Sequence, residues 1–164
     1  MPDRIRGAFR YEGRLKEVVH QFKYEDAFIL SHDLAKVLIP LVREVKDYKT
    51  YNPAFIPLSK EKMRSRGYNQ AELLAQEVGK ALGLKVCDLM DRLAQEETQV
   101  ISKTKTARKQ NIKGVFKIKK NADIPRKVIL IDDVVTTGAT VEEATKVLKR
   151  AGVKKVIVLA LAMG

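Results

Sequence analysis

Several features that are common in other protein classes are missing from this sequence. Its 164 residues include a single cysteine, Cys87, which excludes an internal disulfide and a multi-cysteine zinc site. The longest apolar run, from Val156 to Met163, has eight residues, whereas a membrane helix needs roughly 20. The first residues contain no apolar stretch that could serve as a signal peptide. We therefore expect a cytoplasmic protein with no membrane span.

The length and composition predict one folded domain over residues 1–164. Apolar residues make up 45% of the chain, which is enough for a core and too many for a wholly disordered protein. No internal repeat, low-complexity tract or flexible linker divides the sequence.

The net charge of +12 is concentrated in one segment. Residues 101–127 carry ten basic side chains and one acidic side chain, Asp123. Such a cluster attracts polyanions, either nucleic acid or a small ligand with several phosphates. Phe116 is the only aromatic residue in the segment, so stacking on single-stranded bases has little support. The alternative is a solvated basic loop that only keeps the protein soluble.

Apolar periodicity predicts an α/β fold. Apolar residues at helical spacing predict helices over about 15–22, 34–45, 71–82 and 141–151, and Pro40 should kink or divide the second of them. Continuous apolar runs predict strands over about 54–58, 84–89, 127–131 and 155–162. Strand, helix and strand within the last part of the chain form a βαβ unit, which is typical of a mostly parallel sheet covered by helices on both faces.

The most informative segment is VILIDDVVTTGAT, residues 128–140. Its strand should bring two carboxylates, Asp132 and Asp133, to the carboxyl end, where open α/β sheets bind ligands. The loop that follows consists of Thr136, Thr137, Gly138, Ala139 and Thr140. Hydroxyl donors, a glycine and the free N–H groups of a new helix make a phosphate cradle. A ligand that carries a phosphate next to a diol would satisfy both halves of the segment.

Three other interpretations explain this segment less well. Thr140 and Glu143 fit a helix capping box, but a capping box leaves the two carboxylates unexplained. A P-loop nucleotidase would need a G-x-x-x-x-G-K-[ST] loop, which the chain lacks. A tightly bound metal would need further ligands, and neither His20 nor His32 stands near the acid pair in the sequence.

At this point the sequence resembles a known family. VILIDDVVTTGAT is similar to the phosphoribosyl-pyrophosphate (PRPP) signature of type I phosphoribosyltransferases. FKY at 22–24, PLS at 57–59, RGYNQAELLA at 66–75 and the pattern Q-x8-R-x2-N-x2-G-x-F at 99–116 resemble the ComF family of competence-type phosphoribosyltransferases. The resemblance extends from about residue 9 to residue 162.

This resemblance implies a fold, an activity and a ligand. The fold would be the doubly wound type I sheet, with a helical hood or flank over about 1–50, a core over about 51–164 and a mobile loop over about 93–114. The activity would be transfer of phosphoribose from PRPP, with Mg²⁺, to a nitrogen acceptor with release of pyrophosphate. The acceptor, a nitrogenous base or an amine, is not identified by the motifs, and a homodimer is one assembly expected from related folds.

The resemblance also implies roles for individual residues. Asp132 and Asp133 would bind the ribose hydroxyls, and residues 136–140 the 5-phosphate. A loop over residues 57–66 would face the pyrophosphate, with Ser59, Lys60 and Arg66 as its contacts. Arg108 and Asn111 in the mobile loop would act on the departing pyrophosphate, with Arg108 counted as catalytic beside the two aspartates. Mg²⁺ would be held mainly through the substrate, with Asp132 and Asp133 as the protein groups able to reach it.

Two departures from the family pattern matter. Members commonly begin with a four-cysteine zinc ribbon, but this chain has only Cys87, so we expect no structural zinc in it and a ribbon that is missing or was removed. Thr136 stands where 6-oxopurine enzymes have an aspartate, which argues against hypoxanthine or guanine as the acceptor.

A second hypothesis is a non-catalytic protein. In that case the chain would bind PRPP without turnover, or serve DNA uptake as an accessory of the competence machinery. Single-stranded DNA would then bind the basic segment, with Lys117, Lys119 and Lys120 among its contacts, and the affinity would fall steeply with salt.

Overall fold

The structure is a computed structural model that describes residues 1–25, 27–93 and 114–164. Along the chain the elements are β1 (Arg4–Arg10), α1 (Arg14–Tyr24), α2 (Ala27–Arg43), the 3-10 turn η1 (Tyr48–Thr50), β2 (Asn52–Phe55), α3 (Lys60–Arg66), α4 (Gln70–Leu82), β3 (Met90–Arg92), β4 (Phe116–Ile118), β5 (Lys127–Val135), α6 (Ala139–Arg150) and β6 (Lys155–Met163).

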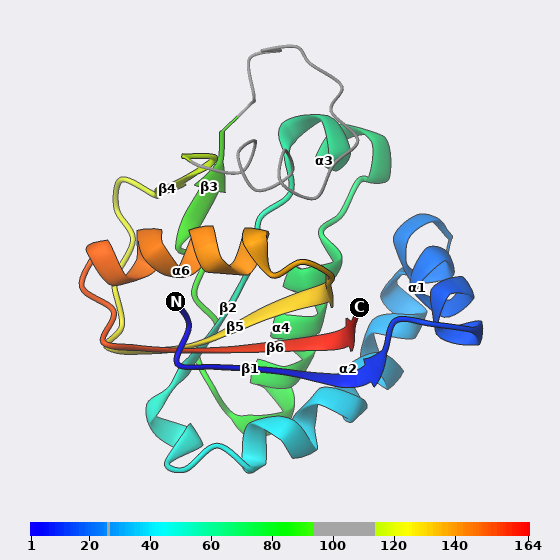
Figure 1. The fold of residues 1–164 in the computed structure, drawn as a ribbon, viewed down its shortest axis with the longest axis horizontal. Helices are drawn as coiled ribbons and strands as arrows, with labels where there is room; N and C mark the ends of the chain where they lie inside the picture. The colour runs from blue at the N-terminus through cyan, green and yellow to red at the C-terminus, as the bar shows by residue number, and fades with distance from the viewer. Residues whose placement is uncertain (26, 94–113) are drawn as a thin grey trace.

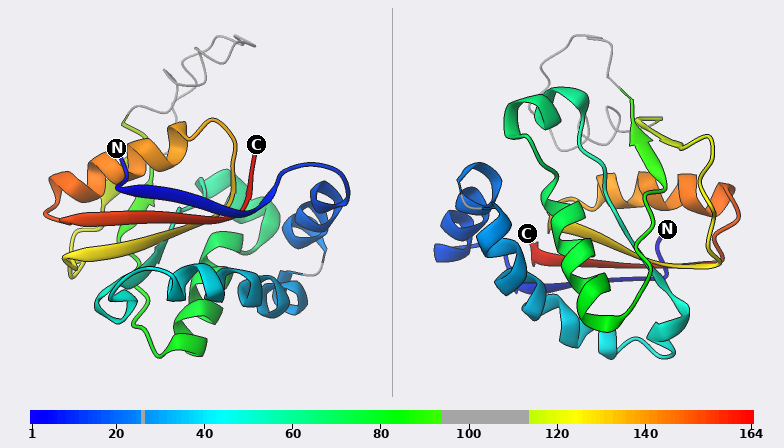
Figure 2. Two further views of the ribbon diagram at one scale, coloured as in Figure 1. Left: turned by 60° about the horizontal axis from the view of Figure 1, so that its bottom comes forward. Right: turned by 180° about the vertical axis from the view of Figure 1, so that it is seen from behind.

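The main sheet has four parallel strands in the order β1-β6-β5-β2. Helices α2 and α4 cover one face and α6 covers the other (Figures 1 and 2). The two faces bury separate apolar clusters, and Val128 to Ile131 of β5 are fully buried between them. Covering both faces explains why β5 and β6 are continuously apolar rather than alternating, and the predicted α/β fold is confirmed.

The parallel strands all have their carboxyl ends on the side of the molecule where α1 lies (Figure 1). A second, two-stranded antiparallel sheet is formed by β3 and β4. Within the part of the chain that the structure describes, no helix is long and apolar enough to cross a membrane.

The structure corrects four local predictions. The segment 84–89 is not a strand, because Cys87 makes only one bridge, to Ala54, and β3 begins later. Pro40 lies inside α2 and does not divide it, so of the two expected effects division does not occur. Residues 60–66 form a short helix rather than a loop. Residues 4–10, placed in a helical flank by the sequence, form the edge strand β1. Its side chains are half-buried or exposed, so it has no buried apolar run to reveal it.

Candidate functional site

The acid pair lies near the carboxyl end of β5, as the sequence predicts. The amide of Asp133 donates to Asp132 Oδ1 at 2.9 Å, and the amide of Val134 donates to Asp133 Oδ1 at 2.8 Å. Burial and the neighbouring charge of Asp133 raise the pKa of Asp132 well above its usual range, while the charge of Lys23 acts in the opposite direction. Two adjacent carboxylates are therefore held in place by their own backbone.

The loop from Thr136 to Thr140 connects β5 to α6. Thr136 and Thr137 are exposed, and Thr137 Oγ1 accepts a hydrogen bond from the Ala139 amide at 3.4 Å. Gly138 has a φ of 76° and stands immediately before α6, a left-handed conformation that glycine adopts without strain. The exposed hydroxyls thus lie beside the first turn of a twelve-residue helix, which is a suitable arrangement for binding a phosphate.

The capping-box interpretation of this segment is wrong. Gly138, not Thr140, precedes the helix, and as a glycine it supplies no capping side chain. The carboxylate of Glu143 instead accepts a hydrogen bond from the Gly114 amide at 2.9 Å. Glu143 therefore connects α6 to Gly114, just before β4.

A lysine from α1 forms an ion pair with one of the two acids, and the sequence did not predict this contact. Lys23 Nζ lies 2.8 Å from Asp133 Oδ2, and the two side chains are only 21% and 15% exposed. More than a hundred residues separate these two partners along the chain, so no periodicity could reveal the contact. The one available signal was the FKY motif at residues 22–24, which supported the family resemblance without receiving a role.

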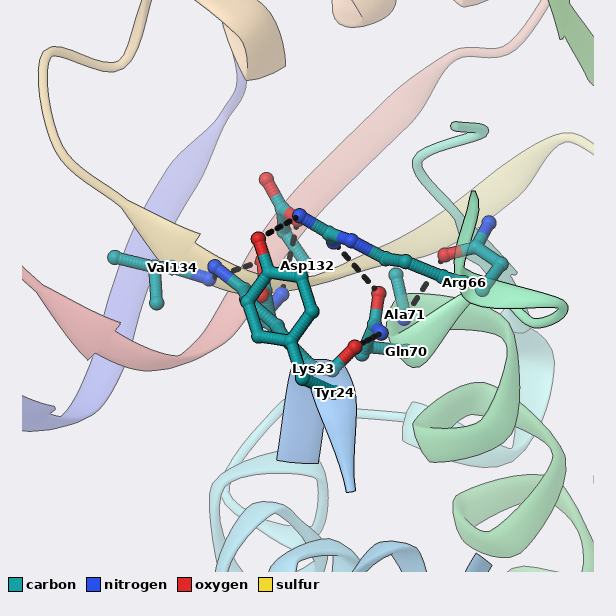
Figure 3. A network of polar contacts seen from close by, with 9 residues as sticks. Lys23, Tyr24, Arg66, Gln70, Ala71, Asp132 and Val134 are labelled. Atoms are coloured by element: carbon teal, nitrogen blue, oxygen red, sulfur yellow. Dashed lines mark hydrogen bonds and ion pairs between the residues drawn. The ribbon is translucent and has the colours of Figure 1, made fainter. Parts of the chain in front are cut away.

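The RGYNQ motif forms the corner that holds this lysine (Figure 3). Arg66 donates to Tyr24 Oη and to Gln70 Oε1, each at 3.2 Å. Gln70, which is 1% exposed, donates from Nε2 to the carbonyl of Lys23 at 3.3 Å. Asn69 caps α4 by accepting from the Ala71 amide and donates to a backbone carbonyl at the end of β2. The motif thus joins α1, α4 and the sheet.

The three residues predicted to contact pyrophosphate lie in different surroundings. Arg66 lies at the site, but its guanidinium is engaged by Tyr24 and Gln70. Ser59 precedes α3 and its hydroxyl accepts from the Lys62 amide at 3.3 Å. Lys60 lines an open cleft of about 630 Å³ between α3 and the β3–β4 sheet. Of these three residues, Arg66 contacts Tyr24 and Gln70, which hold the segment that carries Lys23.

Two further cations stand around the acids. Burial, with the charges of Arg92, Arg66 and Lys23, lowers the pKa of Lys62, while Asp133 raises it. Burial also lowers the pKa of Arg92, and the charge of Asp132 opposes that effect. Neither Lys62 nor Arg92 belongs to a motif that sequence reasoning used. The surroundings of the two carboxylates are therefore strongly cationic and suited to a polyanion.

Arg108 and Asn111 lie outside the described residues, as does most of the predicted mobile loop. Of the lysines considered for DNA contact, Lys117 pairs with Asp91 at 4.0 Å, and Lys119 pairs with Asp88 and with Asp91. These ion pairs offset part of the positive charge that the sequence assigned to the segment.

The donor set fits a metal ion brought by a substrate. Among the described residues, no group of three or more His, Cys, Asp or Glu side chains could hold a metal. Asp132 and Asp133 offer two carboxylates, and Mg²⁺ commonly binds through one or two carboxylates together with substrate phosphates and water. The residues present are therefore compatible with Mg²⁺ that arrives with a phosphorylated ligand.

The chain is similar to known proteins in sequence. Residues 64–163 match the phosphoribosyl transferase domain. The chain is 36% identical over 151 residues to competence protein ComFC of Streptococcus pneumoniae, covering 92% of this chain and 64% of that protein. It is 34% identical over 157 residues to competence protein F of Haemophilus influenzae, covering 90% and 67%. It is 28% identical over 159 residues to DNA utilization protein YhgH of Escherichia coli, covering 92% and 68%. The chain thus spans about two thirds of the length of these relatives.

Two solved structures share the fold. One is an allosteric regulatory enzyme of purine biosynthesis, with a TM-score of 0.52 and 16% identity. The other is the glutamine PRPP amidotransferase of B. subtilis, with a TM-score of 0.52 and 15% identity. Each match covers 82% of this chain and 26% of the other chain, and it supports the similarity of fold alone.

Proposed function

Because the chain belongs to the phosphoribosyltransferase-domain proteins of the ComF family, we propose that it binds PRPP together with Mg²⁺ and transfers the phosphoribosyl group to a nitrogen acceptor. In this reaction the bond between the ribose anomeric carbon and the pyrophosphate oxygen breaks, and the acceptor nitrogen bonds to that carbon. Pyrophosphate leaves with the electron pair of the broken bond.

One observation carries the proposal: Asp132 and Asp133 stand beside the loop of residues 136–140 at the carboxyl end of β5. Carboxylates accept hydrogen bonds from ribose hydroxyls, while the threonine hydroxyls and the N–H groups at the start of α6 donate to a phosphate. A sugar with adjacent hydroxyls and a terminal phosphate would use both groups together. PRPP has this arrangement, and its pyrophosphate adds the negative charge that the surrounding cations favour.

In the proposed reaction the protein positions the substrate and stabilises charge. The acid pair would orient the ribose ring, and residues 136–140 would fix its phosphate end. Lys62 and Arg92, with the predicted contacts Ser59, Lys60 and Arg66, would offer positive charge to the pyrophosphate as it departs. Mg²⁺, when bound with the substrate, would neutralise pyrophosphate charge. Asp132 and Asp133 are the residues that could contact it.

The acceptor is constrained by residue 136. The Thr136 hydroxyl is not a base at neutral pH, so it cannot take the purine proton that an aspartate handles at this position in 6-oxopurine enzymes. We propose an acceptor other than hypoxanthine or guanine, to be identified by screening bases and amines for pyrophosphate release.

Calorimetric titration of PRPP with Mg²⁺ into the protein tests the proposal. Wild-type protein should bind, and Asp132→Asn/Asp133→Asn should lose at least about tenfold in affinity, because the variant loses the negative charge that the acid pair offers to ribose hydroxyls and to Mg²⁺. Asp33→Asn, an exposed change on α2, is the matched control and should bind like wild type. A folded wild type that gives no binding would refute the proposed function.

The names of the relatives support a proposed role for this chain in DNA uptake or use. That role and the phosphoribosyl transfer are compatible, and pyrophosphate release separates a catalyst from a PRPP-binding accessory. Binding without release for any acceptor would favour the accessory role.

A further inference from the structure

The contact between Lys23 and Asp133 has features of a built part of the site. The ammonium and the carboxylate are 2.8 Å apart and largely shielded from water. The backbone of Lys23 is held by the buried side chain of Gln70, and the next residue, Tyr24, is held by Arg66 through its hydroxyl and with the guanidinium 5.0 Å from the ring centroid. Exposed ion pairs on mobile side chains contribute little to stability. Here, however, the Lys23 backbone and the neighbouring residue Tyr24 are both held in place by residues of the RGYNQ motif.

Lys23 engages the carboxylate oxygen that a ligand would need. Asp133 Oδ1 already accepts from the Val134 amide, and Asp133 Oδ2 faces the ammonium. A metal ion or a sugar hydroxyl that binds Asp133 Oδ2 must therefore displace the ammonium or share the oxygen with it. A ligand that uses Asp133 Oδ2 therefore competes with Lys23 for this oxygen.

The charges around Lys23 determine which ligands can compete. The charge of Lys62 acts on Asp133 and that of Arg92 on Asp132, and Lys62 is itself repelled by Arg92, Arg66 and Lys23. Moving the Lys23 ammonium away from Asp133 would place it among these cations without a partner, which is unfavourable. A ligand that carries phosphate groups would give the displaced ammonium a new anionic partner. A free divalent cation or a neutral sugar would not.

We propose that Lys23 determines which ligands can bind Asp133. Only a ligand that carries phosphate charge together with hydroxyls or a cation displaces the Lys23 ammonium from this carboxylate. When such a ligand binds, the Lys23 ammonium leaves the Asp133 carboxylate and pairs with the ligand's phosphate. This inference rests on the proposed function for its phosphorylated ligand, but its first part, exclusion of free divalent cations, stands on the chain's own residues.

Two binding measurements with opposite expected directions test the inference. Mn²⁺ alone, followed by electron paramagnetic resonance of the free ion, should bind Lys23→Met about tenfold more tightly than wild type, because the competing ammonium is gone. PRPP with Mg²⁺, followed by calorimetry, should bind Lys23→Met about tenfold more weakly, because the phosphate loses a charged partner. General damage to the site would weaken both.

The controls separate charge from structure. Lys23→Arg keeps the positive charge and should stay close to wild type in both assays. Lys16→Met removes a lysine from the same helix, one that lies over the Tyr11 ring instead of the acids, and should change neither affinity. In an Asp133→Asn background, Lys23→Met should no longer tighten Mn²⁺, because the two changes act on one contact.

Several results would overturn the inference. These are a Lys23→Met protein whose two affinities move together or not at all, and a wild type that binds Mn²⁺ alone at micromolar concentration. The Mn²⁺ measurement on wild type needs no variant. If the Lys23→Met protein does not fold, Lys23→Gln replaces it. Wild type that binds PRPP while Lys23→Met binds it equally well overturns the inference alone. Wild type that fails to bind PRPP refutes the proposed function, and the Mn²⁺ assay then still decides whether Lys23 excludes the free cation.

Discussion

Replacing Asp132 by asparagine should make the protein more stable at neutral pH while it weakens PRPP binding. Burial and the charge of Asp133 raise the pKa of Asp132 in the folded state. The folded protein therefore binds this proton more tightly than the unfolded chain does. At neutral pH the unfolded chain gains from ionisation that the folded state resists, so this group lowers the free energy of unfolding. Asparagine has no such cost, and its side-chain oxygen can still accept from the Asp133 amide.

The size of the effect follows from the link between proton binding and stability. Each unit by which the folded pKa exceeds the unfolded pKa corresponds to about 1.4 kcal/mol, so the gain in Asp132→Asn should grow by up to about that amount for each pH unit above the ordinary aspartate pKa. For a domain of this size each kcal/mol raises Tm by about 2–4 °C. The gain should vanish below the unfolded pKa, where aspartate is neutral in both states, grow as the pH rises from the unfolded to the folded pKa, and stay constant above the folded pKa.

Urea and thermal unfolding of wild type and Asp132→Asn at pH 3.5 and pH 7.5, each roughly on one side of the ordinary aspartate pKa, would measure this effect. Asp123→Asn is the control, because its carboxylate is 88% exposed and faces Lys85 at 3.5 Å. An Asp132→Asn protein that is less stable than wild type at pH 7.5, or equally stabilised at both pH values, would refute the reasoning.

Three more predictions concern the surroundings of the site. Gln70→Leu should destabilise the protein by about 1–3 kcal/mol, because a buried hydrogen-bond partner is lost, and should speed hydrogen exchange in α1; the exposed Gln76→Leu should do neither. Gly138→Ala should cost about 1–2 kcal/mol in urea unfolding, because φ is 76° there, and equal stability would contradict that conformation. The Gly114 amide holds the pKa of Glu143 below its usual range, so this carboxylate stabilises the fold at neutral pH and loses that effect as the pH falls through its folded pKa. Glu143→Gln should therefore cost about 1 kcal/mol at pH 7 and nothing in acid, and a loss that is independent of pH in thermal unfolding would show another cause.

The sequence alone was sufficient for the parts of the protein that depend on local chemistry. A continuous apolar run predicts β5 because a strand buried on both faces needs apolar side chains at every position. The acid pair and the glycine-containing loop lie within nine residues, so one strand and one turn bring them together. Gly83 is in the left-handed conformation after α4, as expected for a residue that ends a helix. These features are encoded by neighbours in the chain.

Only the tertiary structure decided which other residues reach the acids. Lys23 meets Asp133 because Gln70 and Arg66 fasten α1 to the corner before α4, and that arrangement depends on packing among segments far apart in the sequence. Ion pairs and hydrogen bonds between such segments leave no periodicity, because their partners can occur at any separation. The edge strand β1 escaped prediction for a related reason: it is defined by pairing with β6, while its half-exposed side chains give no apolar pattern of their own.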